Sequence, residues 1–353
     1  MPTAPGLRWS AAAAALALLV AACGDGTGGD SPDRAEEPDS ADPSETAQDD
    51  ASAVGTRTVT FVDSTRPTPA IPERNVPGHD DRTIEVILQY PTSDSADDQD
   101  APIVDAPPAA GRFPLVVFAH GLLADGLALE RRTQHWAGAG YLVALPTFPL
   151  TSGPDAWVED IVQQPADVSF VIDAVLALDA NPDDPLQGHV DTEHVAAGGH
   201  SYGGTTTYGV AFNSCCIDER IDAAISLAGL EVSFPGGDYA HPPATPLLLV
   251  HGERDNLVAI GESSDAVWAK ALPPVYYLRF TAGDHDNYLG RAASPGSQVR
   301  RHPAPREELA EVLDVAVVAF LDAHLRGDAE GLATLPTLTE ESGLATFEAR
   351  PSA

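Results

Sequence analysis

The central part of the chain alternates between short, continuously apolar runs and longer stretches with helical periodicity. Apolar runs without polar interruption predict strands that are buried on both faces of a sheet. The predicted strands are residues 113–119, 141–146, the run from Val195 into Ser201, 221–227, 246–251 and 275–281. The predicted helices are residues 127–139, 165–178, 205–212 and 307–325. This alternation predicts an α/β protein with βαβ units and a mostly parallel central sheet flanked by helices.

The segments on either side of this alternation carry weaker patterns. Residues 56–63 and 82–90 alternate enough between apolar and polar positions to predict two more strands. Residues 93–111 are polar, acidic and proline-rich, which favours a loop. Residues 328–353 show little periodicity. We therefore expect a single folded domain at 55–327, followed by a loosely attached C-terminal tail.

The start of the chain has the pattern of an export signal. Arg8 supplies a small positive charge, and residues 11–22 form an apolar run. This run is too short to cross a bilayer, which takes about 20 residues, and it fits a signal peptide at 1–22. It ends in Leu-Val-Ala-Ala before Cys23, which resembles a bacterial lipobox. The resemblance implies a lipidated Cys23 on an exported, cell-surface or periplasmic lipoprotein of a bacterium; the alternative is ordinary signal cleavage, which leaves Cys23 as a spare thiol.

Acidic residues dominate the composition and define the segment after Cys23. Residues 23–54 contain almost no large apolar side chains and many Asp, Glu, Ser, Pro and Gly. This composition predicts a disordered acidic linker between the lipid anchor and the folded domain. The whole chain has 53 acidic and 19 basic residues and a formal net charge of −34. Such a charge repels phosphate groups, so we expect no nucleic-acid partner.

The sequence Gly-His-Ser-Tyr-Gly at 199–203 fits the Gly-x-Ser-x-Gly pattern of a nucleophile elbow. In this elbow a strand turns sharply into a helix and lifts the serine hydroxyl clear of the sheet. The strained serine backbone requires small residues two positions away on both sides, and Gly199 and Gly203 meet that requirement. The pattern alone is weak, but a strand-like run precedes it and a helix of small residues can follow. Ser201 is therefore the candidate nucleophile.

Two later strand ends supply candidates for the base and the acid that a serine nucleophile needs. The predicted strand at 246–251 leads into a loop with Asp255, and the strand at 275–281 leads into a loop with His285. Loops at the carboxyl ends of parallel strands meet at one edge of the sheet. Ser201, Asp255 and His285 follow the Ser, Asp, His order of α/β-hydrolases. Glu253 in the same loop is the alternative acid.

Four places together resemble the α/β-hydrolase superfamily over about residues 56–325. They are the strand end at 118–122, the elbow at 199–204, the acid loop at 251–258 and the histidine loop at 283–285. Within the superfamily, the chain is most similar to platelet-activating-factor-acetylhydrolase-like esterases and bacterial polyester-hydrolase-like secreted lipases. The resemblance implies an α/β-hydrolase fold and a serine hydrolase that cleaves carboxylic esters through a Ser-His-Asp triad and an acyl-enzyme, without a cofactor.

The oxyanion of such a reaction needs fixed hydrogen-bond donors. The backbone N–H of Tyr202 follows from the elbow. The backbone N–H of Leu122 follows from the loop after the strand at 113–119, and Leu123 is its alternative.

The substrate is less well defined by the sequence. Polyester-hydrolase relatives typically carry Met after the serine and a C-terminal disulfide, whereas here Tyr202 follows Ser201 and no cysteine follows Cys216. Residues 149–165 are too few for a large cap domain, so we expect an open site for short or medium acyl chains of a small-molecule ester or lipid-like substrate. A serine peptidase of the same fold and a non-catalytic surface-binding lipoprotein are the alternatives.

Several other reactive side chains receive structural interpretations. We expect His120, His200 and His251 to pack or to hold loop backbones rather than to act as bases. Cys215 and Cys216 are adjacent and form either a vicinal disulfide or two buried thiols. No cluster of His, Asp or Glu has convincing metal-ligand spacing, so we expect no metal.

Overall fold

The computed structural model describes residues 52–94, 101–239, 245–289 and 307–351, all of which belong to one compact unit that begins at Asp49. The predicted signal peptide, Cys23 and nearly all of the predicted linker lie outside the described residues. The first strand, β1, begins at Ala53, inside the last two residues of that linker.

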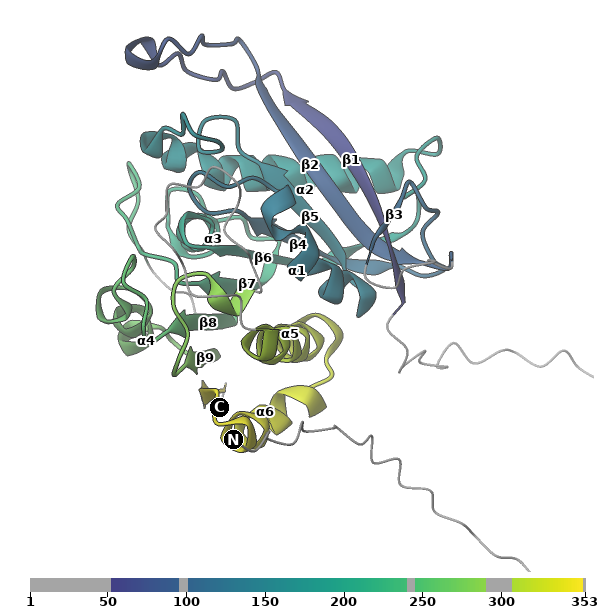
Figure 1. Ribbon diagram of the computed structural model, residues 1–353. Coiled ribbons are helices and arrows are strands. Elements are labelled where there is room, and N and C mark those ends of the chain that lie inside the picture. The colour runs from purple at the N-terminus through teal and green to yellow at the C-terminus, as the bar shows by residue number, and fades with distance from the viewer. Residues whose placement is uncertain (1–51, 95–100, 240–244, 290–306, 352–353) are drawn as a thin grey trace, which may run out of the picture. The chain divides into compact units, whose positions relative to one another are not determined.

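The described residues form a single sheet with the strand order β10-β9-β8-β7-β6-β4-β5-β2-β1-β3. Neighbouring strands from β4 to β9 pair in parallel, whereas β2 pairs antiparallel with β1 and β5, and β10 pairs antiparallel with β9 (Figure 1). The strands are β1 (Ala53–Asp63), β2 (Arg82–Thr92), β3 (Ile103–Val104), β4 (Phe113–Ala119), β5 (Leu142–Thr147), β6 (Val190–His200), β7 (Ile221–Leu227), β8 (Leu247–Gly252), β9 (Val275–Phe280) and β10 (Ala345–Arg350).

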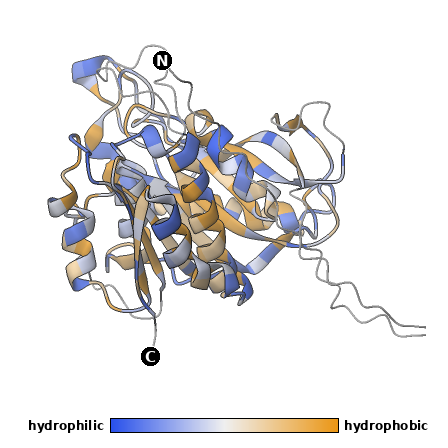
Figure 2. Cartoon of the chain, turned by 60° about the horizontal axis from the view of Figure 1, so that its bottom comes forward, coloured by the Kyte–Doolittle hydropathy of each residue, from blue (hydrophilic) through white to orange (hydrophobic). Residues whose placement is uncertain are grey.

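Helices cover both faces of this sheet. One buried cluster joins the sheet to α1, α5 and α6, and a second joins it to α2, α3 and α4. Hydrophobic residues run along the strands, and hydrophilic residues gather on the outer sides of the helices and in loops (Figure 2). The α-helices are α1 (Leu127–Gly138), α2 (Gln164–Ala180), α3 (Tyr202–Phe212), α4 (Ser264–Lys270), α5 (Glu307–Leu321) and α6 (Glu330–Ser342).

The continuous apolar character of the central strands follows from this double cover. In β4 every residue is buried, and alternate side chains enter the two clusters. Phe118 packs edge-on against Trp136 of α1, with 4.9 Å between ring centroids. The indole N–H of Trp136 donates to Asp314 of α5, so its burial leaves no polar atom unsatisfied. The predicted α/β fold with a mostly parallel sheet is therefore confirmed.

The connection from β5 to α2 is short and carries no cap domain. It contains one 3-10 helix, η2 (Val158–Gln163), which runs directly into α2. Within the described residues, the stretch Val158–Ala180 is long and apolar enough to cross a membrane by length and composition alone. Its apolar residues Val168, Val171, Ile172 and Val175 are buried in the cluster under the sheet, which accounts for this composition.

The C-terminal segment corrects the expectation of a loosely attached tail. Residues 328–350 form α6 and β10, and β10 extends the sheet by pairing with β9 along its whole length. Leu332 and Leu335 of α6 belong to the main buried cluster. The folded domain therefore continues past residue 327 to the end of β10.

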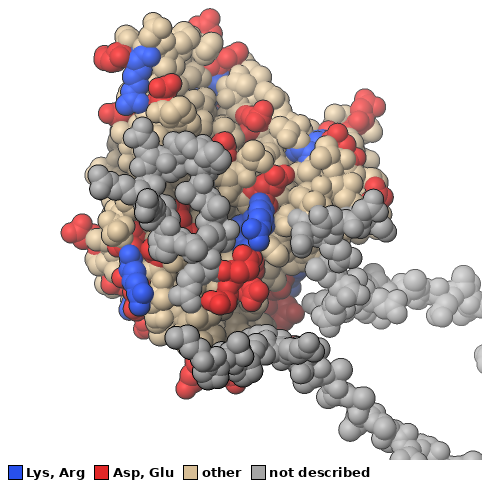
Figure 3. All heavy atoms as spheres, in the orientation of Figure 1, with Lys and Arg blue, Asp and Glu red and all other residues tan. Residues whose placement is uncertain are grey.

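Acidic side chains occur in several places on the face of the molecule shown in Figure 3. On the face shown in Figure 3, Asp and Glu are scattered among uncharged residues, and the few Lys and Arg side chains lie next to acidic ones. This distribution agrees with the excess of acidic residues in the sequence.

Candidate active site

Ser201 occupies a sharp turn between β6 and α3. Its φ of 56° and ψ of −117° lie in a region that non-glycine residues rarely adopt, at a cost of order 1–3 kcal/mol. A Cβ at Gly199 would lie 2.3 Å from the carbonyl carbon of Gly203, and a Cβ at Gly203 would lie 2.0 Å from the carbonyl oxygen of Ala119. Only glycine fits at both positions, because the elbow packs directly on itself and on the end of β4.

Asp255 and His285 come together from the loops that follow β8 and β9. His285 Nδ1 lies 2.7 Å from Asp255 Oδ2. The second oxygen, Oδ1, accepts hydrogen bonds from the backbone N–H groups of Leu257 and Val258, at 2.8 and 2.9 Å. The alternative acid, Glu253, is exposed. The structure therefore pairs His285 with Asp255.

His251 is a second partner of the same carboxylate. Its Nε2 lies 3.1 Å from Asp255 Oδ2, and its Nδ1 lies 2.8 Å from the Ser264 hydroxyl. Burial alone would raise the pKa of Asp255, but the hydrogen bonds from His251 and His285 hold this pKa well below its ordinary value. Asp255 is consequently ionised at neutral pH. Sequence reasoning expected a structural His251 but missed this contact; the spacing of four residues between His251 and Asp255 was the one available signal.

A hydrogen bond joins the loop of His285 to the elbow. His200, next to Ser201, is buried, and its Nε2 donates to the backbone carbonyl of His285 at 2.7 Å. The loop itself is closed by Asp284, whose Oδ1 accepts from the backbone N–H groups of Asp286 and Asn287 at 3.0 and 2.8 Å. Within the described residues, neither the Ser201 hydroxyl nor His285 Nε2 makes a hydrogen bond.

The loop after β4 brings Leu122 and Leu123 to the same edge of the sheet. The backbone N–H of Leu123 donates to Thr151 O at 2.8 Å, and Leu123 adopts a left-handed φ of 71°. Its N–H is therefore already engaged, whereas Leu122 N–H has no backbone acceptor among the described residues. His120 fixes this loop, since its Nε2 accepts from Phe148 N–H at 3.0 Å and its Nδ1 donates to Gly121 O at 2.8 Å.

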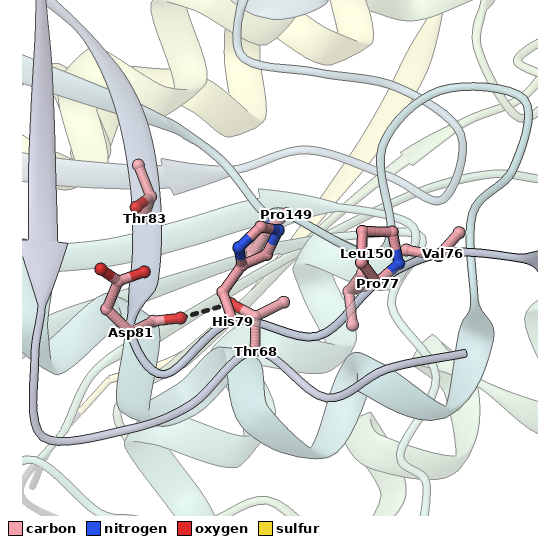
Figure 4. A pocket seen from close by; sticks show the side chains of 8 residues that line it. All are labelled: Thr68, Val76, Pro77, His79, Asp81, Thr83, Pro149 and Leu150. Carbon is pink, nitrogen blue, oxygen red and sulfur yellow. Dashed lines mark hydrogen bonds between the residues drawn. The ribbon is translucent and has the colours of Figure 1, made fainter. Parts of the chain in front are cut away.

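An open cavity of about 290 Å³ lies beside β5 and β2. Figure 4 shows His79 central among its lining side chains, with prolines and a leucine on one side and Asp81 and Thr83 on the other. Its lining residues come from the segment between β1 and β2, from the start of β2 and from the loop after β5. Its lining residues, Thr68, Val76, Pro77, His79, Asp81, Thr83, Pro149 and Leu150, include none of the candidate catalytic residues.

Cys215 and Cys216 form a vicinal disulfide, one of the two states that the sequence allowed. They follow the far end of α3, whose first residue comes directly after Ser201. No three His, Cys, Asp or Glu side chains among the described residues gather in a way that could hold a metal ion.

Comparison with known proteins supports the fold. The family described as Chlorophyllase matches residues 80–231, a segment that includes the elbow. Many solved structures resemble the chain. One of them, a ferulic acid esterase from Streptomyces cinnamoneus, has 23% sequence identity and a TM-score of 0.62, and the match covers 84% of this chain and 96% of that one. No curated protein matches the sequence.

These observations agree on the fold. The strand order, the serine at the turn between β6 and α3, and the family match all describe the same kind of protein. The chain has an α/β-hydrolase fold, and its residues 80–231 match the family described as Chlorophyllase.

Proposed function

We propose that this enzyme cleaves carboxylic esters through an acyl-enzyme on Ser201, with His285 as the base and Asp255 as the acid that orients it. One observation carries this assignment. His285 is hydrogen-bonded to Asp255 at 2.7 Å, and the backbone carbonyl of His285 accepts a hydrogen bond from His200, the residue next to Ser201. His285 thus has an ionised carboxylate on one ring nitrogen, and its other ring nitrogen makes no hydrogen bond in the described part of the chain.

The reaction follows from these positions. His285 Nε2 takes the proton of the Ser201 hydroxyl as the oxygen attacks the ester carbonyl, and the imidazolium then protonates the leaving alcohol. Water repeats the sequence on the acyl-enzyme and restores the serine. Asp255 holds the proton on Nδ1, so that Nε2 is the basic nitrogen. Catalytic hydrogen bonds often tighten only with substrate, so the Ser201–His285 bond forms in the complex.

Leu122 and Tyr202 supply the proposed oxyanion donors. Tyr202 is the first residue of α3, where backbone N–H groups have no partner within the helix. Leu122 is the better candidate in its loop because Leu123 N–H is bonded to Thr151 O. Removal of one such donor typically costs about 3 kcal/mol of transition-state stabilisation.

The surroundings of Ser201 support an apolar ester with a short or medium acyl chain as the substrate. Leu123, Leu230 and Leu257 are exposed apolar residues on the loops that follow β4, β7 and β8 at the carboxyl edge of the sheet. No cap domain covers this edge within the described connection from β5 to α2. The similarity to a ferulic acid esterase adds aromatic acyl esters to the substrates worth testing.

The first prediction tests the nucleophile. Ser201→Ala should abolish hydrolysis of p-nitrophenyl esters from acetate to decanoate and of a feruloyl ester, because the proposed acyl-enzyme forms on the Ser201 hydroxyl. Kinetics of wild type and variant on this panel, with a peptide p-nitroanilide added to detect a peptidase, check it. Near-native turnover by the variant would exclude Ser201, and preference for the anilide would favour the peptidase.

The second prediction tests the acid. Asp255→Asn should favour the wrong tautomer of His285 and lower turnover by up to about 10⁴. Glu253→Gln is the matched control from the same loop and should leave turnover nearly unchanged. Measurement of kcat for both variants decides the assignment, and the opposite ranking would move the acid to Glu253.

We also propose that Cys23 carries a lipid anchor that holds the enzyme at the outer side of a bacterial membrane. The support is the apolar run that ends immediately before Cys23 and the acidic segment that separates it from β1. One acyl chain gives reversible membrane binding, whereas several chains hold a protein firmly.

The third prediction follows from this anchor. In cells that express the full chain, Cys23→Ser should move the enzyme from the membrane fraction to the soluble fraction with its esterase activity intact. Mass spectrometry of the wild-type N-terminus should find a diacylglycerol on Cys23. An unmodified mature N-terminus at another residue would end the proposal.

A further inference from the structure

We propose that Gln164 is a positioning residue that sets the distance between the two halves of the oxyanion hole; this inference rests on the proposed function. Gln164 is the first residue of α2, and among the described residues its side chain makes no hydrogen bond to Leu122 or Tyr202. Its amide instead joins the two segments that carry those donors.

The first connection runs to the loop after β4. Gln164 Nε2 donates to the Thr151 hydroxyl at 2.6 Å. The carbonyl oxygen of Thr151 accepts the backbone N–H of Leu123 at 2.8 Å. Leu123 also forms a parallel bridge with Ser152. The position of the Leu122–Leu123 peptide therefore depends on where Thr151 is held.

The second connection runs to the start of α3. The Thr206 hydroxyl donates to Gln164 Oε1 and lies 3.0 Å from the carbonyl oxygen of Tyr202. Gln164, Thr151 and Thr206 are all fully buried. A single amide thus spans from the Leu123 segment to the Tyr202 segment without exposure to water, which strengthens each bond.

A buried ionic cluster holds the chain segments immediately before and after Gln164. Arg82 of β2 donates to Asp160 in η2 and to Asp167 in α2, with the closest contacts at 2.6 Å. All three side chains are fully buried. Gln164 lies between these two anchored residues, so its backbone is held and its amide serves as a rigid spacer.

This arrangement has a kinetic signature. Loss of the amide should loosen the separation of the two donors, and a misplacement of about 1 Å at a catalytic group can cost about 10²-fold in rate. The loss should appear in kcat rather than in KM, because the oxyanion forms only after the ester is bound. A trifluoromethyl ketone, whose adduct with the serine carries the oxyanion, should lose affinity in proportion.

The chain offers a matched control. Gln89 of β2 is also fully buried, accepts a hydrogen bond from the Thr133 hydroxyl at 2.6 Å and donates to Glu130 O at 2.9 Å. Its strand partner is Val143, near the amino end of β5 and away from the edge that carries Ser201. Gln89→Met removes the same chemistry as Gln164→Met without contact to either donor segment.

The experiment compares these variants in the full chain. Gln164→Met should lower kcat on p-nitrophenyl butyrate about 10- to 100-fold with KM within about twofold, and should weaken the trifluoromethyl ketone similarly. Gln89→Met should keep kcat within about twofold at a comparable melting temperature. Thr206→Val should reproduce the loss of kcat, and Thr206→Ser should retain the wild-type kcat. If Gln164→Met does not fold, these two variants test the inference in its place.

Two results would overturn the inference. One is a kcat of Gln164→Met equal to that of Gln89→Met, and the other is a loss carried entirely by KM. If the wild type hydrolyses the ester and Ser201→Ala does not, either result contradicts the role of Gln164 and leaves the proposed function intact. A wild type without esterase activity would overturn the proposed function and this inference together.

Discussion

The close packing of the elbow is the constraint on which the rest of the site depends. Gly203 lies against the carbonyl oxygen of Ala119, and Gly199 lies against Gly203, so β4, β6 and α3 meet without room for a side chain. This contact fixes Ser201 in its unfavourable backbone conformation and brings the loop after β4 beside the start of α3. The parallel sheet and its two buried clusters supply the stability that holds the strained residue in place.

The other parts of the site attach to this point through buried polar contacts. His200 links the elbow to the backbone of His285, and Asp255 links His285 to His251 and to its own loop. Each buried charge or amide in these contacts has partners, as the low-dielectric interior requires. The loops after β4, β6, β8 and β9 are thus held in fixed positions relative to one another. This is the preorganisation that the proposed ester hydrolysis needs.

Much of the fold was predictable because central parallel strands have an unmistakable pattern. Residues 113–119 and 221–227 match β4 and β7 at both ends, since a strand buried on both faces must be apolar throughout. Strand β10 was missed because it lies at the edge of the sheet, where only Ala345 of its six residues is buried and no apolar run marks it. Its identity depends on pairing with β9, which local sequence does not encode.

The sequence predicted the candidate site residues through motif order, but not their supporting contacts. The choice between Leu122 and Leu123 depends on the backbone of one loop, in which Leu123 takes a positive φ and gives its N–H to Thr151. The contacts of Gln164 join residues 13 and 42 positions apart in the sequence and leave no periodic pattern in it.

The central claim is that Ser201 is the one activated serine, and covalent labelling with a fluorophosphonate tests it most directly. Peptide mass spectrometry after labelling should find one adduct per chain, on Ser201. An adduct on a different residue, or no adduct on a protein that still hydrolyses esters, would contradict the account.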